Sequence, residues 1–167
     1  MSPSTATTSA YRAPMRTLRI DDGTAAEWAI SAGVVGLDGA IQAQVDSLDE
    51  VLAAVDLELD ERTARRIRRF TLTPAGSLVW TQDRSGGLHL GRLGDGQRYA
   101  RDNVALRLGL PHQRDCEWAA GPVPVELIPA AVIETFGRGG RNWQEVRADA
   151  GASALLWDRL DAGPTQS

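Results

Sequence analysis

The side chains with the clearest chemical potential surround one predicted hairpin, residues 78–99. Trp80 lies in its first strand and Tyr99 follows its second strand, and both offer flat aromatic faces for stacking. Arg84 lies in the turn at 83–87, and further arginines follow along the second strand. A guanidinium group donates several hydrogen bonds in one plane and suits phosphate oxygens. Aromatic faces beside arginines, without catalytic carboxylates or histidines, favour recognition of a flat ligand over catalysis.

The residue types needed for common catalytic and metal sites are scarce. All 18 basic residues are arginine, which excludes lysine-dependent phosphate loops, Schiff-base chemistry and lysine-containing nuclease sites. His89 and His112 are the only histidines, and Cys116 is the single cysteine. A structural zinc site needs four ligands, which this set does not supply. Cys116 is expected to be buried beside Trp118 in a strand, so it is a poor nucleophile. We therefore expect no enzyme, no metal and no cofactor.

The length of 167 residues fits a single domain, and the net charge of −4 is unevenly distributed along it. Eight acidic and no basic residues lie from Asp38 to Glu61, whereas residues 84–114 hold six arginines and two acids. Five more arginines cluster at 62–69. A protein that is acidic overall can carry a basic face that binds phosphates. The alternative is that each cluster is only a solvated surface.

The sequence has no feature of a membrane or exported protein. No apolar run is long enough for a transmembrane helix, and the polar N-terminus does not resemble a secretory signal. The single cysteine fits a reducing compartment. These features predict a cytoplasmic protein without membrane contact.

Capping residues and hydrophobic spacing predict a mixture of helices and strands. Ser47 and Glu50 form a capping box that begins one helix, and a second helix is expected from Asp60 to about Phe70. Strands are expected at 27–30, 33–37 and 115–118 and in the 78–99 hairpin, with further helices at 129–136 and 152–160. Because the elements lack a repeated strand–helix–strand order, the sequence predicts an α+β fold.

The order of these elements resembles the PUA-like superfamily, and within it the EVE and YTH-type modules that read modified bases. The likeness is closest to EVE-like domains of modification-dependent restriction proteins, over about residues 24–120. It is carried by Trp28, Gly33-Val34-Val35-Gly36, Val79-Trp80, Gly87, Gly91-Arg92 and Arg98-Tyr99. The resemblance implies a small curved β-barrel with flanking helices. Residues 16–160 would form this single domain with a C-terminal helical extension, between a disordered segment at 1–15 and a loose tail at 161–167.

The resemblance also implies a pocket for one base flipped out of a duplex. Flipping costs about a few kcal/mol and is offset by stacking and by hydrogen bonds to the base edge. The expected pocket residues are Ser31, Val35, Leu37, Asp38, Trp80, Thr81 and Tyr99, with Trp80 and Tyr99 as stacking faces. The expected phosphate ligands are Arg84, Arg92, Arg98, Arg101 and Arg107. Packing in the core is the expected role of Trp28, Trp118, Trp143 and Trp157.

The first functional hypothesis is therefore a DNA-binding protein that recognises a modified base, with 5-methylcytosine as the first choice. Such a protein would serve restriction of, or response to, methylated DNA, with a separate nuclease as the cleaving partner. Two alternatives remain open. One is an RNA-binding module that reads a modified transcript or tRNA, and the other is a regulatory protein that uses the helix at 60–70 as its partner face.

Overall fold

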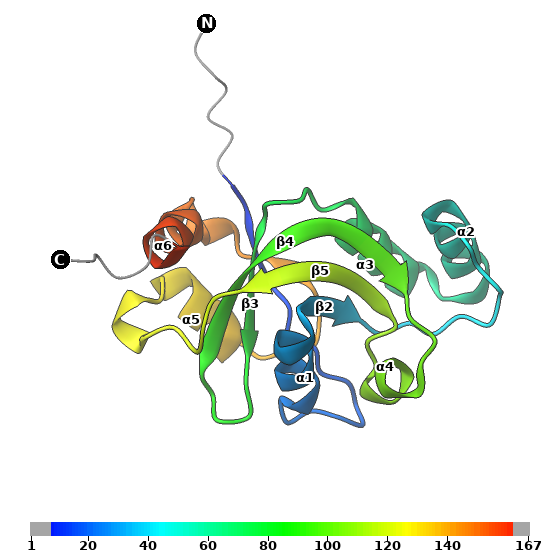
Figure 1. Cartoon of the computed structure of the whole chain (residues 1–167), viewed down its shortest axis with the longest axis horizontal. Helices are drawn as coiled ribbons and strands as arrows, with labels where there is room; N and C mark the ends of the chain where they lie inside the picture. Colours follow the sequence, from blue (N-terminus) through cyan, green and yellow to red (C-terminus); the bar gives the residue numbers. More distant parts are fainter. Residues whose placement is uncertain (1–7, 162–167) are drawn as a thin grey trace, which may run out of the picture.

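The computed structural model describes residues 8–161, which fold around one open, mixed sheet of six strands (Figure 1). The strands are β1 (Ala10–Arg12), β2 (Val34–Leu37), β3 (Leu78–Gln82), β4 (Leu88–Tyr99), β5 (His112–Trp118) and β6 (Gln144–Glu145). Their order across the sheet is β2-β5-β4-β3-β1-β6. β1 runs parallel to β3, and the other neighbouring pairs are antiparallel. The predicted α+β class is confirmed.

Six α-helices flank the sheet. They are α1 (Thr24–Ala32), α2 (Leu48–Glu58), α3 (Glu61–Leu72), α4 (Asn103–Leu108), α5 (Ala130–Gly137) and α6 (Ala152–Asp161). In Figure 1, α2 and α3 lie toward one end of the long strands and α5 and α6 toward the other. The helices predicted near 129–136 and 152–160 are confirmed as α5 and α6. Within residues 8–161, no helix is both long and apolar enough to cross a membrane.

Local capping residues begin α2 and α3, as predicted. The Ser47 hydroxyl accepts a hydrogen bond from the Glu50 backbone N–H at 3.2 Å. The Asp60 carboxylate accepts one from the Thr63 N–H at 2.8 Å. Each cap satisfies a donor that the first helical turn cannot satisfy itself.

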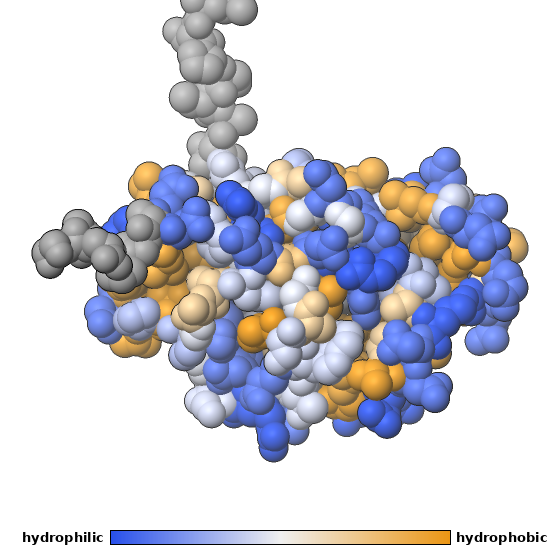
Figure 2. All heavy atoms as spheres, in the orientation of Figure 1, coloured by the Kyte–Doolittle hydropathy of each residue, from blue (hydrophilic) through white to orange (hydrophobic). Residues whose placement is uncertain are grey.

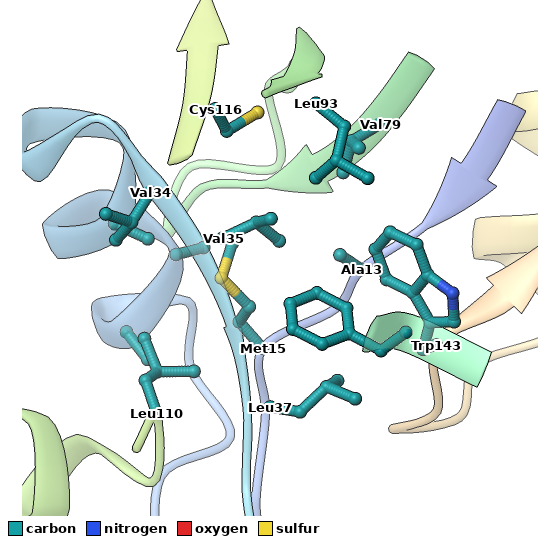
Figure 3. Close-up of a cluster of buried hydrophobic side chains, with 14 of the residues drawn as sticks. Ala13, Met15, Val34, Val35, Leu37, Val79, Leu93, Leu110, Cys116 and Trp143 are labelled. Atoms are coloured by element: carbon teal, nitrogen blue, oxygen red, sulfur yellow. The ribbon is translucent and has the colours of Figure 1, made fainter. Parts of the chain in front are cut away.

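The predicted β-barrel is wrong because the sheet does not close. Its two edges are β2 and the two-residue strand β6, at opposite ends of the strand order. Side chains fill the space between these edges. Val35 of β2, Phe70 of α3 and Trp143, which directly precedes β6, belong to one buried cluster (Figure 3). A helix therefore packs where closure of a barrel would need hydrogen-bonded strands.

The predicted strand at 27–30 is also wrong, since these residues form the middle of α1. Glycines with positive φ flank this helix: Gly23 at +94° precedes it and Gly33 at +71° ends it. The Gly33 N–H donates to carbonyl groups of the last turn, as glycines at helix C-termini commonly do. Three buried alanines face the core from one side of α1, namely Ala25, Ala26 and Ala29. The first strand expected from the resemblance is therefore part of a helix.

The N-terminal segment departs from the predicted disorder at 1–15. Residues 10–12 form β1, which pairs with β3 on one side and with β6 on the other. The backbone of β1 is thus satisfied inside the sheet, and Ala10 is almost fully buried. Residues 1–7 and most of the predicted tail at 161–167 lie outside the described residues.

The predicted hairpin and its neighbouring strands are confirmed. β3 and β4 pair in antiparallel register, and the strands predicted at 33–37 and 115–118 form β2 and part of β5. In the turn, Asp83 accepts hydrogen bonds from the N–H groups of Ser85 and Gly87 and contacts His89 Nε2 at 2.8 Å. Although burial opposes ionisation, these hydrogen bonds leave the pKa of Asp83 below its usual value.

A buried arginine fastens the C-terminus of α3 to the sheet. Arg114 of β5 is 2% exposed. Its Nη1 donates to the carbonyl oxygens of Phe70, at 3.0 Å, and Thr73, and its Nη2 donates to that of Gly94 at 2.9 Å. The last carbonyl groups of a helix lack partners within the helix and interact favourably with a cation. Burial lowers the pKa of Arg114, but a guanidinium remains charged.

Replacing Arg114 should therefore destabilise the fold strongly. We expect Arg114→Met to lower the free energy of unfolding by at least about 3 kcal/mol, because it leaves carbonyl oxygens buried without donors. Arg92→Met is the matched control, since Arg92 is exposed in a surface ion pair and should cost less than about 1 kcal/mol. Urea denaturation measures both. Equal losses in the two variants would contradict the structural role of Arg114.

Candidate functional site

The expected base pocket on the hairpin is closed by packing. Val35, Trp80 and Thr81 are all 0% exposed. The Trp80 indole Nε1 donates to Ser153 Oγ at 2.8 Å, and that hydroxyl donates to Asp149 at 2.6 Å. Trp80 therefore joins α6 to the sheet and has no free face for a ligand. Its predicted stacking role is wrong.

Tyr99 also has a positioning role. Its hydroxyl accepts a hydrogen bond from the Ile41 N–H at 2.8 Å and donates to the Ile41 carbonyl at 3.3 Å. Arg101 lies over the Tyr99 ring at 5.0 Å and donates to the carbonyl of Ala43. Together the two side chains hold the segment that follows β2. Tyr99 also lines a cavity of about 250 Å³ together with Arg98, and the ligand roles predicted for Tyr99 and Arg101 stay predictions.

Three other predicted phosphate ligands contact acidic side chains. Arg92 pairs with Glu117 at 3.2 Å, and Arg98 pairs with Asp115 at 2.8 Å, both across β4 and β5. Figure 2 shows a mixed surface over these strands, with hydrophilic side chains in blue beside pale and orange ones. Arg84, in the hairpin turn, lies 4.0 Å from Asp22. Ser31 is exposed in the last turn of α1, away from these arginines.

The remaining predicted residues, Leu37, Asp38 and Arg107, do come together. They line one cleft of about 790 Å³, called here the α3–α4 cleft. Its arginines are Arg16, Arg19, Arg62, Arg66, Arg107 and Arg141, and its further lining residues include Leu106, Leu110 and Asn142. Asp38 is the one acidic side chain among the described residues that line it. The cleft is therefore strongly cationic.

Helix periodicity places two arginines of α3, Arg62 and Arg66, along this cleft. Ala64 and Ile67 are buried against α2, so Arg62 and Arg66 lie on the outer side of the helix. Arg66 Nη1 donates to Asn142 Oδ1 at 2.7 Å, which ties α3 to the loop before β6. These arginines were recognised as a charged cluster from the sequence. Their joint site with residues far along the chain was not.

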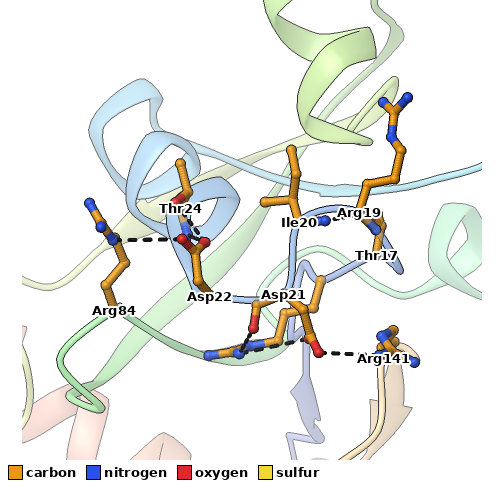
Figure 4. Close-up of polar contacts among 9 residues, drawn as sticks. Thr17, Arg19, Ile20, Asp21, Asp22, Thr24, Arg84 and Arg141 are labelled. Atoms are coloured by element: carbon orange, nitrogen blue, oxygen red, sulfur yellow. Dashed lines mark hydrogen bonds and ion pairs between the residues drawn. The ribbon is translucent and has the colours of Figure 1, made fainter.

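An aspartate links the two chain segments at the rim of the cleft. Asp21 accepts a hydrogen bond from Arg141 at 3.1 Å and lies 3.8 Å from Arg16 Nη1 (Figure 4). Arg19 points away from this cluster in the same view and has no ion pair within the described residues. No sequence motif singled out these residues, because the Asp21–Arg141 contact joins positions 120 residues apart.

The turn that carries Asp38 is held by close packing at Gly39 and by a hydrogen bond from His112. Gly39 has a φ of +129°, and a Cβ there would lie 2.6 Å from Ile67 Cδ1. The Gly39 carbonyl is 2.6 Å from His112 Nε2, so this nitrogen carries the proton that it donates. Burial lowers the pKa of His112, against the opposing effect of that hydrogen bond. A neutral His112 therefore holds the turn that carries Asp38.

The chemistry of the cleft is binding rather than proton transfer. Arginine guanidinium groups hold anionic oxygens, and they do not release protons near neutral pH. Across residues 8–161, no group of three or more His, Cys, Asp or Glu side chains is arranged to hold a metal ion. Burial raises the pKa of the Cys116 thiol, so it stays protonated. The site suits an anion with several charged groups.

No model of a known protein family, no curated protein and no solved structure matches this chain.

The structural role of Trp80 has a measurable consequence. We expect Trp80→Phe to lower the free energy of unfolding by about 1–3 kcal/mol, because it removes a buried hydrogen bond and leaves a void. The same substitution at an exposed aromatic residue that is free to bind a ligand would cost less than about 0.5 kcal/mol. Thermal denaturation distinguishes the two, with the half-buried Trp28→Phe as control. An unchanged Tm for Trp80→Phe would contradict this assignment.

The buried His112 should make stability depend on pH near neutrality. Because its folded pKa lies below 6.5, the unfolded chain binds a proton first as the pH falls. The free energy of unfolding should therefore fall between about pH 7.5 and pH 5.5, by at most about 1.4 kcal/mol per pH unit. His112→Gln should flatten this dependence in urea denaturation. An equal slope in both proteins would show that another group is responsible.

Proposed function

We propose that this protein binds DNA and that the arginines of the α3–α4 cleft hold the phosphates of one strand. The observation that carries the proposal is the charge of the cleft, six arginines against Asp38 among its described lining residues. Phosphate contacts supply most of the sequence-independent affinity for nucleic acids, and arginine makes them in bidentate form. A local basic surface also reconciles polyanion binding with a net charge of −4.

The cleft also offers contacts for one base turned out of the stack. Asp38 Oδ1 accepts from the Gly39 N–H, and Oδ2 has no hydrogen bond within the described chain. A carboxylate oxygen of this kind can accept a hydrogen bond from the N4 amino group of cytosine. Leu37 and the half-exposed Leu106 are apolar neighbours for a methyl group on that base. No aromatic side chain lines the cleft in residues 8–161, so the base stacks on a guanidinium plane.

This function needs neither a catalytic residue nor a cofactor. The protein acts as a reader of DNA that carries a modified cytosine, with 5-methylcytosine as the first candidate, and any cleavage comes from a separate nuclease. A cytoplasmic location belongs to the same proposal, and the buried free thiol of Cys116 is consistent with it.

Fluorescence anisotropy with labelled duplexes tests the proposal. We expect binding at low salt, tighter for a duplex with 5-methylcytosine than for its unmodified counterpart, and a steep loss of affinity as salt rises. Arg62→Gln/Arg66→Gln should weaken binding of both duplexes at least about tenfold and reduce the salt slope by about 2, one for each lost phosphate contact. Asp38→Asn should weaken binding of both duplexes, because methylation at C5 leaves the N4 amino group of cytosine unchanged.

Arg92→Gln/Arg98→Gln is the matched control, because it removes the same number of arginines from the β4–β5 face. It should leave affinity within about twofold of the parent protein. Equal affinity of the control and the Arg62/Arg66 variant would reject the α3–α4 cleft. A strong preference for single-stranded RNA of the same sequence would reject DNA as the ligand and select the RNA-binding alternative.

A further inference from the structure

A second arginine-lined cleft lies beside the first on α3. It is called here the α3–β6 cleft and has a volume of about 910 Å³. Its charged lining residues are Arg65, Arg68, Arg69, Arg138, Arg147 and Glu145. At 100° per residue, Arg65 and Arg69 occupy the sector of α3 next to that of Arg62 and Arg66. One helix thus presents arginines to both clefts.

Two ion pairs in the α3–β6 cleft are exposed, so a ligand can replace their acidic partner. Arg65 pairs with Glu61 at 2.9 Å, and Arg147 pairs with Glu145 at 3.4 Å, in both cases with highly exposed arginine side chains. Exposed pairs contribute about 0–1 kcal/mol, so a phosphate can replace the acidic partner at little cost. Arg69 has no ion pair in the described part of the chain. Arginines here are therefore available to a polyanion.

This cleft contains the aromatic side chains that the first cleft lacks. Tyr11 and Trp143 stack at 4.9 Å between ring centroids, with 11° between their planes, and both line the cleft. Tyr11 is half-buried, which leaves part of its ring accessible. The indole Nε1 of Trp143 is a buried donor without an acceptor among residues 8–161. Arginines beside an aromatic platform are the combination that single-stranded nucleic acids bind.

One residue joins the two clefts. Asn142 lines both, and its side chain accepts the hydrogen bond from Arg66. We propose that the α3–β6 cleft is a second nucleic-acid subsite and that one strand passes from the α3–α4 cleft over Asn142 into it. Arg65, Arg69 and Arg147 hold the phosphates of this continuation, and Tyr11 stacks against a base. This inference rests on the proposed function, because it extends the strand held by the first cleft.

The length dependence of binding tests the subsite. Anisotropy titrations of the full chain use oligothymidylates of about 4, 8 and 16 nucleotides, which cover the range of known single-strand sites. For the parent protein we expect affinity to rise with length until both clefts are filled. Arg65→Gln/Arg69→Gln should lose about tenfold in affinity for the longer probes and little for the shortest, and its salt slope with long probes should fall by about 1.4.

Arg147→Gln is an independent variant, because it changes the opposite wall of the cleft and leaves α3 intact. It should give a smaller loss of the same length dependence, while Arg92→Gln/Arg98→Gln should behave as the parent protein. If both cleft variants match the parent at every length, the second subsite is wrong and the first cleft stands. If the parent binds no probe of any length or duplex form, the proposed function fails, and the subsite fails with it.

Discussion

The position of α3 depends on a charged group buried beneath its C-terminus. Arg114 reaches from β5 to carbonyl oxygens at Phe70, Thr73 and Gly94, so that a helix end, a turn and the middle of β4 share one guanidinium. Burying such an ion is costly unless acceptors meet its N–H groups, and three carbonyl oxygens do so here, while Nε has no partner among residues 8–161. The same contact fixes which sectors of α3 face outward. The two clefts therefore depend on this interaction, and of its residues only Thr73 lines one of them, the α3–β6 cleft.

A second buried arginine, Arg12, joins the end of another helix to the sheet. Arg12 of β1 donates to the carbonyl oxygens of Thr135 at 2.8 Å and Gly139 at 2.6 Å, at the end of α5. Burial lowers its pKa, and a Cβ on Gly140 would lie 2.9 Å from its Nη2. The loop that follows carries Asn142. The arginines of the described chain thus include a buried pair, Arg12 and Arg114, that holds helix ends to the sheet, while the others are at least partly exposed.

Features whose partners lie close in sequence could be predicted, and those with distant partners could not. The Ser47 cap was recognised because its donor, the Glu50 N–H, lies three residues away. Trp80 was misjudged because its partner, Ser153, is 73 residues away. The barrel failed for a related reason, since the packing of Phe70 between the sheet edges is a tertiary contact. Of the expected site residues, Leu37, Asp38 and Arg107 line the α3–α4 cleft together, and the arginines beside them there come from distant parts of the chain.

The acidic segment at 38–61 supplies partners for the arginines of α3. Asp56 of α2 pairs with Arg68, and Glu61 pairs with Arg65, so acids from 38–61 partly neutralise the arginine helix when no ligand is present. Like charges spaced three or four residues apart destabilise an isolated helix, and these pairs relieve that repulsion. Because the pairs are exposed and weak, breaking them would cost little in the nucleic-acid binding proposed above. Net charge is therefore a poor guide to what this surface binds, and the arrangement of opposite charges around one helix is a better one.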